Sequence, residues 1–349
     1  MKSALAITVG DYNGIGPEVV LKSIRQPSIL RLCRPVLVGP REAFLYYANK
    51  FHFRLHLVSV PAEARDTPDT FSDFLRSLPA RSCALLESSA VPAASIDPGT
   101  LSRDAGRAAV EAIEHAAALA VSGKVSGMVT APVSKQAIHE AGVSFPGQTE
   151  MVQHLSSSPN VVMMLVSPTL RVGLVTIHVP VSGIAPLITA PLLRQKIGVV
   201  HAALVRDWGI PAPRIAVLGL NPHAGEGGSI GREEERIIVP VVEDFSRAGI
   251  DIHGPFPADG FFARYEPRSY HAVIAMYHDQ GLIPLKMSSS GRAVNVSAGL
   301  SIVRTSPDHG TAFNIAGQKK ADPSSMIEAI KLAIRIAHNR LNATPRSGS

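Results

Sequence analysis

The chain has 349 residues, of which 46% are hydrophobic and 18% charged, and its formal net charge is +6. This is the composition of a packed globular protein with room for two domains or one large α/β unit. No basic block interleaved with aromatic residues suggests a nucleic-acid surface, and the mild positive charge suits a small anionic substrate. We therefore expect neither nucleic acid nor a membrane as a partner.

The location of the protein is indicated by its cysteines and its apolar runs. Cys33 and Cys83 cannot form a disulfide framework, and no CxxC pair suggests structural zinc. No apolar run reaches the roughly 18 residues that a membrane span needs. The N-terminal MKSALAITVG lacks the features of a signal peptide and is interpreted as a first strand. These features predict a cytoplasmic protein.

Short apolar runs alternate with helical patterns along the chain, which predicts an α/β fold with a largely parallel sheet. The stretch from about 60 to 100 has the weakest periodicity and is predicted to be irregular surface or a sheet edge. Ser102 or Asp104 is a possible N-cap, Gly123 a stop signal, and Pro240 a possible kink. The predicted strands are 4–9, 34–39, 127–131, 161–166, 171–178, 214–220 and 271–278, and the predicted helices are 16–25, 102–123, 233–249 and 324–341.

Three apolar runs, each interpreted as containing a buried strand, end on a histidine: RVGLVTIH at His178, RIAVLGLNPH at His223 and HAVIAMYH at His278. Ligands of open α/β sheets bind beyond the carboxyl ends of the strands. Imidazole is a common ligand of divalent transition metals, and three protein ligands leave positions open for a substrate. Three unrelated histidines in strand-end loops are the alternative interpretation.

Other loops carry weaker signals. The first, GDYNGIGPEVV, lacks the GxGxxG dinucleotide fingerprint, and a plain turn is favoured over an anion site at its helix start. Gln148 and Thr149 close a predicted ordered loop, 130–150, and could bind a substrate or simply be solvated. The four glycines of 221–235 allow a nest of backbone N–H groups for an anion, or a flexible loop. Between Lys286 and Arg304 there is no acidic residue, which favours recognition of a phosphate or carboxylate.

Long motifs then carry a resemblance to a known family. HGTAFNIAGQKKADP resembles the cofactor loop of the isocitrate and isopropylmalate dehydrogenase superfamily, which binds NAD without GxGxxG. GDYNGIGPE, TAPVSKQAIHEAGVSFPGQTE, GLNPHAGEGGSIGREEE, GPFPADG, AMYHDQGLIPLK and RTSPDHGTA resemble the motifs of the 4-hydroxythreonine-4-phosphate dehydrogenase family. The resemblance runs from about residue 4 to residue 335.

This resemblance implies two α/β domains with mostly parallel sheets and an active site in a cleft between them, at the interface of a homodimer. The first domain would comprise 1–130 and about 300–349 and carry the cofactor loop. The second, about 131–299, would carry the metal, substrate and dimer contacts. His278 would be supplied by the partner subunit.

The resemblance also implies site residues. The cofactors would be NAD, with NADP possible, and a divalent ion such as Zn, Mg, Mn or Co. Lys286 and Asp259 are the candidates for proton transfer or charge stabilisation. The metal ligands would be His178, His223 and His278, the substrate ligands Gln148, Thr149, Lys286, Asn295 and Arg304, and the cofactor ligands Asp308, His309, Gly310, Thr311 and Asn314.

The expected activity is NAD- and metal-dependent oxidation of a hydroxy acid, followed by decarboxylation. Lys286, Asn295 and Arg304 favour 4-phosphohydroxy-L-threonine, of pyridoxal phosphate biosynthesis, or a related phosphorylated hydroxy acid. The family's GHTE motif is GQTE here, with Gln148 in place of a histidine, and Tyr12 and Asn13 replace the usual Pro and Ala. The change at Gln148 keeps one alternative open, a cis-dihydrodiol dehydrogenase for aromatic dicarboxylates of the terephthalate type. A non-catalytic metabolite-binding homologue is a separate, third possibility.

Overall fold

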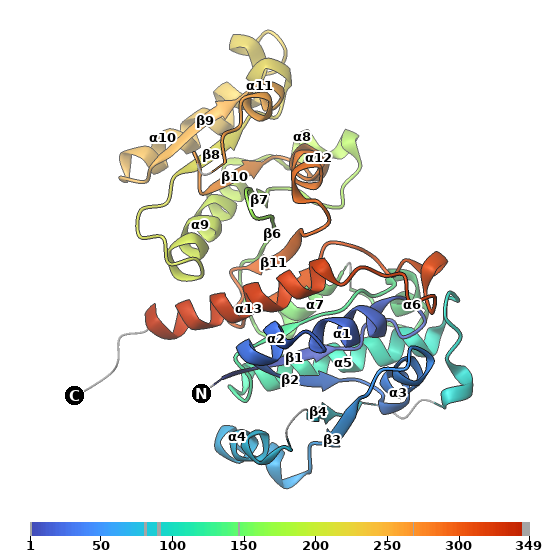
Figure 1. Ribbon diagram of the computed structural model, residues 1–349. Helices are drawn as coiled ribbons and strands as arrows, with labels where there is room; N and C mark the ends of the chain where they lie inside the picture. Colours follow the sequence, from blue (N-terminus) through green and yellow to red (C-terminus); the bar gives the residue numbers. More distant parts are fainter. Residues whose placement is uncertain (1, 80–81, 89–91, 146, 268, 344–349) are drawn as a thin grey trace, which may run out of the picture. The chain divides into compact units, whose positions relative to one another are not determined.

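The computed structural model describes residues 2–79, 82–88, 92–145, 147–267 and 269–343, in two compact units (Figure 1). Unit 1 comprises Met1–Ser158 and Leu300–Ala337, and unit 2 comprises Pro159–Gly299 and His338–Ser349. The end of the first predicted domain, 344–349, lies outside the described residues. The sequence placed a boundary near 130, whereas the contacts place it after Ser158.

Unit 1 is built on parallel strands in the order β3-β4-β2-β1-β5-β12. Strand β12 follows about 175 residues after β5, yet Arg304 and Thr305 pair with Met128 and Val129. The strands are β1 Ser3–Thr8, β2 Cys33–Val38, β3 His56–Ser59, β4 Ser82–Leu86, β5 Gly127–Val129 and β12 Arg304–Pro307. The helices are α1 Gly16–Ile24, α2 Pro27–Leu32, α3 Arg41–Lys50, α4 Pro68–Ser77, α5 Arg103–Val121, α6 Lys135–Glu140, α7 Gln148–Leu155 and α13 Ser324–Ala343, with short 3-10 turns at Glu63–Arg65, Ala93–Ser95 and Phe313–Ile315. The last turns of α13, from His338 on, belong to unit 2.

The long helix α5 explains why 131–158 joins unit 1. Ser102 caps its N-terminus by accepting a hydrogen bond from the Ala105 backbone, as predicted. Alanines at helical spacing bury one face against β1, β2 and β5. A Cβ on Gly106 would lie 2.1 Å from the Ala137 carbonyl, so the absence of a side chain there lets α6 approach α5 closely. Helix α7 also contacts α5.

Unit 2 holds strands in the order β11-β6-β7-β10-β8-β9. The strands β7, β10, β8 and β9 are parallel, and β6 runs antiparallel to both β7 and β11. The strands are β6 Val162–Val166, β7 Arg171–Leu174, β8 Ile215–Leu218, β9 Ile252–Phe256, β10 Ala272–Ala275 and β11 Val294–Ala298. The helices are α8 Ile184–Leu187, α9 Ala190–Arg206, α10 Val239–Arg247, α11 Ala258–Ala263 and α12 His278–Ser289, with 3-10 segments at Val181–Gly183 and Pro222–Gly228 and a π turn at Glu234–Ile238.

Helices α9 and α12 cover opposite faces of the unit 2 sheet. A Cβ on Gly173 would meet Val200 of α9, whereas a Cβ on Gly281 of α12 would meet Val172 and Leu174. Neighbouring residues of a strand point to opposite faces, so the two helices lie on different sides of β7. The aliphatic core under α12 includes Leu165, Leu218, Val273, Leu282 and Leu285.

The mostly parallel α/β architecture is confirmed, and several local predictions are corrected. The stretch 60–100 is not simply irregular: it contains α4 and β4, with β3 and β4 at one end of the strand order. The predicted loop 130–150 contains α6 and begins α7. The predicted helix 233–249 is divided into the π turn and α10, with Pro240 in the first turn of α10. In the ranges that the structure describes, no helix is long and apolar enough to cross a membrane.

Candidate functional site

The three histidines predicted as metal ligands follow three neighbouring parallel strands of unit 2. Strand β10 pairs with β7 on one side and with β8 on the other. His178 comes four residues after β7 ends, His223 five after β8, and His278 three after β10. The predicted strands 171–178 and 271–278 reached the histidines, whereas the observed strands end at Leu174 and Ala275; beyond these ends the Val175 and Thr176 backbone still donates to the Ala275 and Met276 carbonyls. The carboxyl ends of parallel strands share one edge, so all three turns belong to one end of this sheet.

Two of the three imidazoles lie close together. The ring centroids of His178 and His278 are 6.0 Å apart, and both residues line a pocket of about 440 Å³. Asp279 Oδ1 lies 2.6 Å from His278 Nδ1, an arrangement that leaves Nε2 of that ring for a ligand. His223 does not line this pocket, and no group of three metal-ligating side chains converges among the described residues.

His223 stands at the start of a left-handed segment. The φ angles from His223 to Gly227 are 52°, 51°, 81°, 43° and 59°. Left-handed backbone costs a non-glycine residue about 1–2 kcal/mol, so His223, Ala224 and Glu226 require outside support. The predicted glycine-rich nest is therefore an ordered, strained turn. Glu234, which is 2% exposed, accepts hydrogen bonds from the Leu220 and Asn221 backbone, both at 2.7 Å.

In unit 1, the predicted substrate residues gather around a buried guanidinium. Arg304 is 2% exposed and donates to Thr130 Oγ1 at 2.7 Å, Gln148 Oε1 at 3.1 Å and Thr149 Oγ1 at 3.4 Å. Burial lowers the pKa of Arg304 to about 10, and the charge of Glu150 acts in the opposite direction. Arg304 therefore stays cationic at neutral pH, and the Thr130, Gln148 and Thr149 oxygen atoms among its partners are neutral. Such a buried cation favours an anionic ligand.

Thr130 was not predicted as a site residue. It follows β5 directly, and its hydroxyl accepts two hydrogen bonds from Arg304, at 2.7 and 3.1 Å. The sequence signal was its place at the carboxyl end of a predicted strand.

The predicted cofactor loop packs against the first loop of the chain. The Ile15 backbone donates to the Thr311 carbonyl at 2.9 Å, and a Cβ on Gly14 would lie 2.9 Å from Thr311. Asp308 and Thr311 are half-buried, whereas Gly310 and Asn314 are exposed. Burial lowers the pKa of His309, which keeps the imidazole neutral, and its Nε2 is buried with no hydrogen-bond partner. The two loops thus form one structural element.

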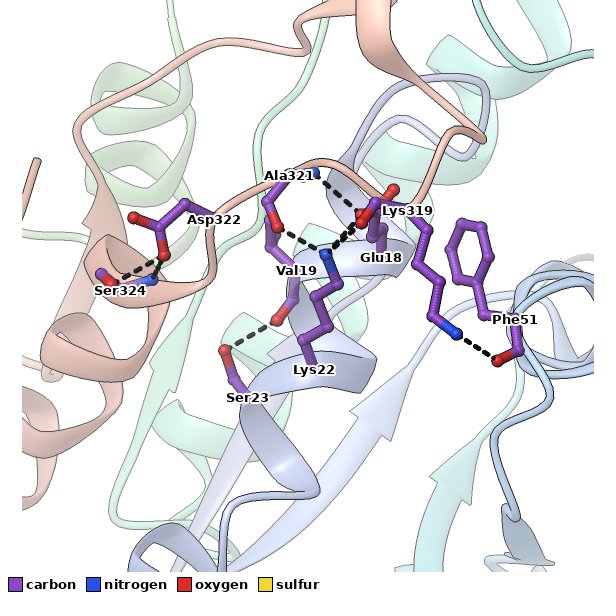
Figure 2. Close-up of polar contacts among 9 residues, drawn as sticks. All are labelled: Glu18, Val19, Lys22, Ser23, Phe51, Lys319, Ala321, Asp322 and Ser324. Carbon is purple, nitrogen blue, oxygen red and sulfur yellow. Dashed lines mark hydrogen bonds and ion pairs between the residues drawn. The ribbon is translucent and has the colours of Figure 1, made fainter.

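An ion pair on α1 fixes the end of the cofactor loop (Figure 2). Lys22 Nζ lies 2.7 Å from Glu18 Oε1 and donates to the carbonyls of Lys319, at 2.9 Å, and Ala321, at 2.7 Å. Glu18 Oε1 also accepts from the Ala321 backbone at 2.9 Å. Lys319 in turn donates to the Phe51 carbonyl. Glu18, which is fully buried, therefore anchors the end of this loop.

The two unusual residues of the first loop have structural partners. Tyr12 is fully buried, and its carbonyl accepts a hydrogen bond from Tyr47. Asn13 accepts from the Asp97 backbone at 2.9 Å and donates to Thr100 Oγ1 at 3.3 Å. The Asn13 side chain therefore ties the first loop to the segment before α5, whereas Tyr12 meets Tyr47 of α3 through its backbone carbonyl.

The remaining predicted residues belong to unit 2. Lys286 lies on an exposed part of α12, and Asn295 is half-buried in β11 with its Oδ1 buried and without a hydrogen-bond partner. Asp259 is exposed in the first turn of α11 and lines a second pocket, of about 340 Å³, with Asp279 and Gln280. Lys286 and Asn295 line neither pocket.

Comparison with known proteins matches this combination of fold and site. The model of the family described as pyridoxal phosphate biosynthetic protein PdxA matches residues 31–333. A 4-hydroxythreonine-4-phosphate dehydrogenase of Trichlorobacter lovleyi is 42% identical over 97% of this chain and 99% of its own length. A D-threonate 4-phosphate dehydrogenase of Cupriavidus necator is 40% identical, over 96% and 98%. The crystal structure of the 4-hydroxythreonine-4-phosphate dehydrogenase of Klebsiella pneumoniae is 36% identical, with a TM-score of 0.83 over 97% of this chain and 98% of that one.

These matches define the chain as an enzyme, a dehydrogenase that acts on a CH–OH group. It belongs to the PdxA family. The predicted family and fold class are confirmed.

Proposed function

We propose that the protein oxidises 4-phosphohydroxy-L-threonine, or a closely related phosphorylated hydroxy acid, with NAD and a divalent metal, and that the product loses carbon dioxide. One observation carries this proposal: three histidine-bearing turns follow three neighbouring parallel strands, in a chain whose curated relatives act on 4-phosphates by name. The buried Arg304 cluster supports the choice of an anionic substrate.

The donor chemistry of the turns fits a divalent transition metal. We assign the ion to His178, His223 and His278, with Asp279 orienting the last of these. A bound ion would supply Lewis acidity that lowers the pKa of the substrate hydroxyl. Following the family resemblance, we propose a shared site in which the partner subunit supplies His278; a shared site is compatible with the finding that no three ligands converge within the described part of one chain.

Exposed apolar side chains support the homodimer. Val181, beside His178, is 84% exposed, and Ile283 and Met287 on α12 are 59% and 83% exposed. These three residues line the two pockets of unit 2. Contiguous exposed apolar surface rimmed by polar residues is typical of an interface.

Arg304 is the proposed clamp for the substrate phosphate, with Gln148 and Thr149 beside it. Gln148 directs its carbonyl oxygen at Arg304, so its amide group remains as a pair of donors toward an anion. Lys286 and Asn295 are assigned to the same substrate, and Lys286 or Asp259 to proton transfer. A positioned acid or base of this kind typically contributes 10²–10⁴-fold to the rate.

NAD, which accepts the hydride, is assigned to the loop from Asp308 to Asn314. The close approach of Gly14 to Thr311 means that the first loop of the chain packs directly against the loop from Asp308 to Asn314. Protection of the Gly310 and Thr311 amides from hydrogen exchange on addition of NAD is expected. Protection confined to Gly14 and Gly16 would contradict the assignment.

The substrate is tested by one assay. NAD reduction is measured with 4-phosphohydroxy-L-threonine, 4-phospho-D-erythronate and the terephthalate cis-dihydrodiol, each with added metal and after chelation. Turnover of a phosphorylated compound that disappears on chelation is expected. Turnover of the dihydrodiol alone would favour the alternative that Gln148 raises, and no turnover with bound metabolite would favour a non-catalytic homologue.

A further inference from the structure

Beyond the histidines themselves, unit 2 contains a chain of buried and partly buried hydrogen bonds that joins the three turns that carry them. It begins at Thr176, two residues before His178. The Thr176 hydroxyl donates to the Met276 carbonyl at 2.7 Å, and the Thr176 backbone donates to the same oxygen at 3.1 Å. Thr176 is 5% exposed and Met276 fully buried. The His178 turn is therefore attached to the residue that lies two positions before His278.

Gln280 continues the chain to the third turn. Its Oε1 accepts from the Met276 backbone at 2.7 Å, and its Nε2 donates to the Gly219 carbonyl at 2.7 Å. One side chain, two residues after His278, thus binds the end of β10 and the end of β8. Both functional groups of the amide are used, which fixes its orientation.

Glu234 completes the arrangement at the turn that carries His223. Its Oε1 accepts from the Leu220 and Asn221 backbone, and its Oε2 accepts from Asn221 Nδ2 at 2.9 Å. A Cβ on Gly219 would lie 3.1 Å from Glu234 Oε1, so the carboxylate fills the space beside that residue. Glu234 also opens the π turn, a geometry that is frequent at functional sites.

We propose that Thr176, Gln280 and Glu234 are positioning residues that fix the three histidine turns of one chain relative to one another before a metal binds, so that each shared site receives ligands that are already ordered in both subunits. This inference rests on the proposed metal site. None of the three touches the ion; each fixes backbone beside a ligand. A ligand set that is ordered in advance binds more tightly because less conformational entropy is lost on binding.

The test measures Co²⁺ binding to the full-length apoprotein by titration calorimetry and by the visible absorption of the bound ion. The variants are Thr176→Val, Gln280→Met and Glu234→Gln, which change hydrogen bonding with little change in volume. Thr176→Ser retains the hydroxyl and serves as the rescue. Thr305→Val is the matched control, because Thr305 is a fully buried threonine of unit 1 that donates to the Ala329 carbonyl at 2.9 Å.

We expect Co²⁺ affinity to fall by about 10- to 100-fold in T176V, Q280M and E234Q, and to stay near the wild-type value in T176S and T305V. The absorption spectrum of Co²⁺ bound to T176V, Q280M and E234Q should also change, because the metal ligands are held less firmly in position. Affinity that is unchanged in T176V and Q280M, or that falls equally in T305V, would overturn the inference. If Q280M or E234Q does not fold, the comparison of T176V with T176S decides.

A further variant separates this inference from the proposed function. If His223→Ala binds Co²⁺ as tightly as the wild type, the metal assignment itself fails. If His223→Ala loses the ion while T176V and Q280M keep it, the metal site stands and the positioning role is wrong.

Discussion

Glu18 and Lys22 stand one helical turn apart on α1, and together they hold a segment almost 300 positions later in the chain (Figure 2). The Glu18 side chain is fully buried, and the Lys22 side chain is 19% exposed. Such pairs contribute little when solvated, but breaking one in a buried site leaves an uncompensated charge. The pair therefore couples the stability of unit 1 to the position of the loop that we assign to the cofactor.

Replacing Lys22 with Met should lower the free energy of unfolding by about 3 kcal/mol, because the Glu18 carboxylate would remain buried without its cation. The measurement is urea denaturation followed by circular dichroism. Lys331→Met is the control, since Lys331 pairs with Glu328 on the surface and both side chains are more than 30% exposed; its loss should stay below about 1 kcal/mol. Equal losses in the two variants would show that burial of Glu18 does not matter.

The buried carboxyl of Asp11 should make the free energy of unfolding depend on pH. Burial raises the pKa of this carboxyl from 3.8 to about 6, and its Oδ2 has no hydrogen-bond partner. Because the pKa in the folded state lies above the unfolded value, the contribution of Asp11 is fully present below 3.8 and is lost as the pH rises through about 6. Asp11→Asn keeps an acceptor for the Asn13 backbone without this loss.

Relative to the wild type, Asp11→Asn should therefore gain up to about 3 kcal/mol of stability between about pH 4 and about pH 8. Urea denaturation of both proteins at the two pH values measures the gain. A constant difference between them would mean that Asp11 ionises normally in the folded protein.

Periodicity was sufficient to predict the alternating α/β fold, but it could not predict how unit 1 is completed. Strand β12, RTSP, is four residues long and begins with an arginine, so it carries no strand signal by itself. It is a strand because β5 pairs with it across a long sequence separation. Strand β3 was missed because it is short and half-exposed. Strand β4 is mostly buried but only five residues long, and it is fixed by pairing with β2 and β3.

The candidate site was predictable in its residue types and less so in its supports. The placement of His178, His223 and His278 after strands came from the sequence, because a buried run that ends on a polar side chain indicates a strand end. No comparable sequence pattern indicates the roles of Thr176, Gln280 and Glu234. Their importance depends on which backbone groups they meet, and that follows from the packing of separate strands.

Restoring the family residue at position 148 should change the pH dependence of substrate binding. In Gln148→His, a ring nitrogen would replace the amide oxygen near Arg304, and protonation would add a second cation. KM for a phosphorylated substrate should then fall as the pH is lowered from about 8 to about 6, whereas the wild type should lack this step. Parallel KM profiles in the two proteins would show that residue 148 does not face the anion.

Arg304 itself should be intolerant of conservative change. Arg304→Lys keeps the charge but cannot bind Thr130, Gln148 and Thr149 at once, because it lacks the planar fork of the guanidinium. We expect kcat/KM to fall by about 100-fold, mainly through KM. Arg103→Lys, at the exposed start of α5, is the control. Unchanged KM in Arg304→Lys would remove Arg304 from the substrate site.

The pairing of β12 with β5 also affects how the chain matures during synthesis. Unit 2 is almost continuous in sequence, from Pro159 to Gly299, so most of it is available before β12 has been made. Synthesis of unit 1 begins first, but its sheet is incomplete until Arg304–Pro307 has been made and has paired with β5. Until then one side of β5 has unpaired backbone groups, which are a template for wrong strand pairing. A nascent chain stalled after β5 but before β12 should therefore depend on chaperones more than a chain stalled before β5 or the finished chain.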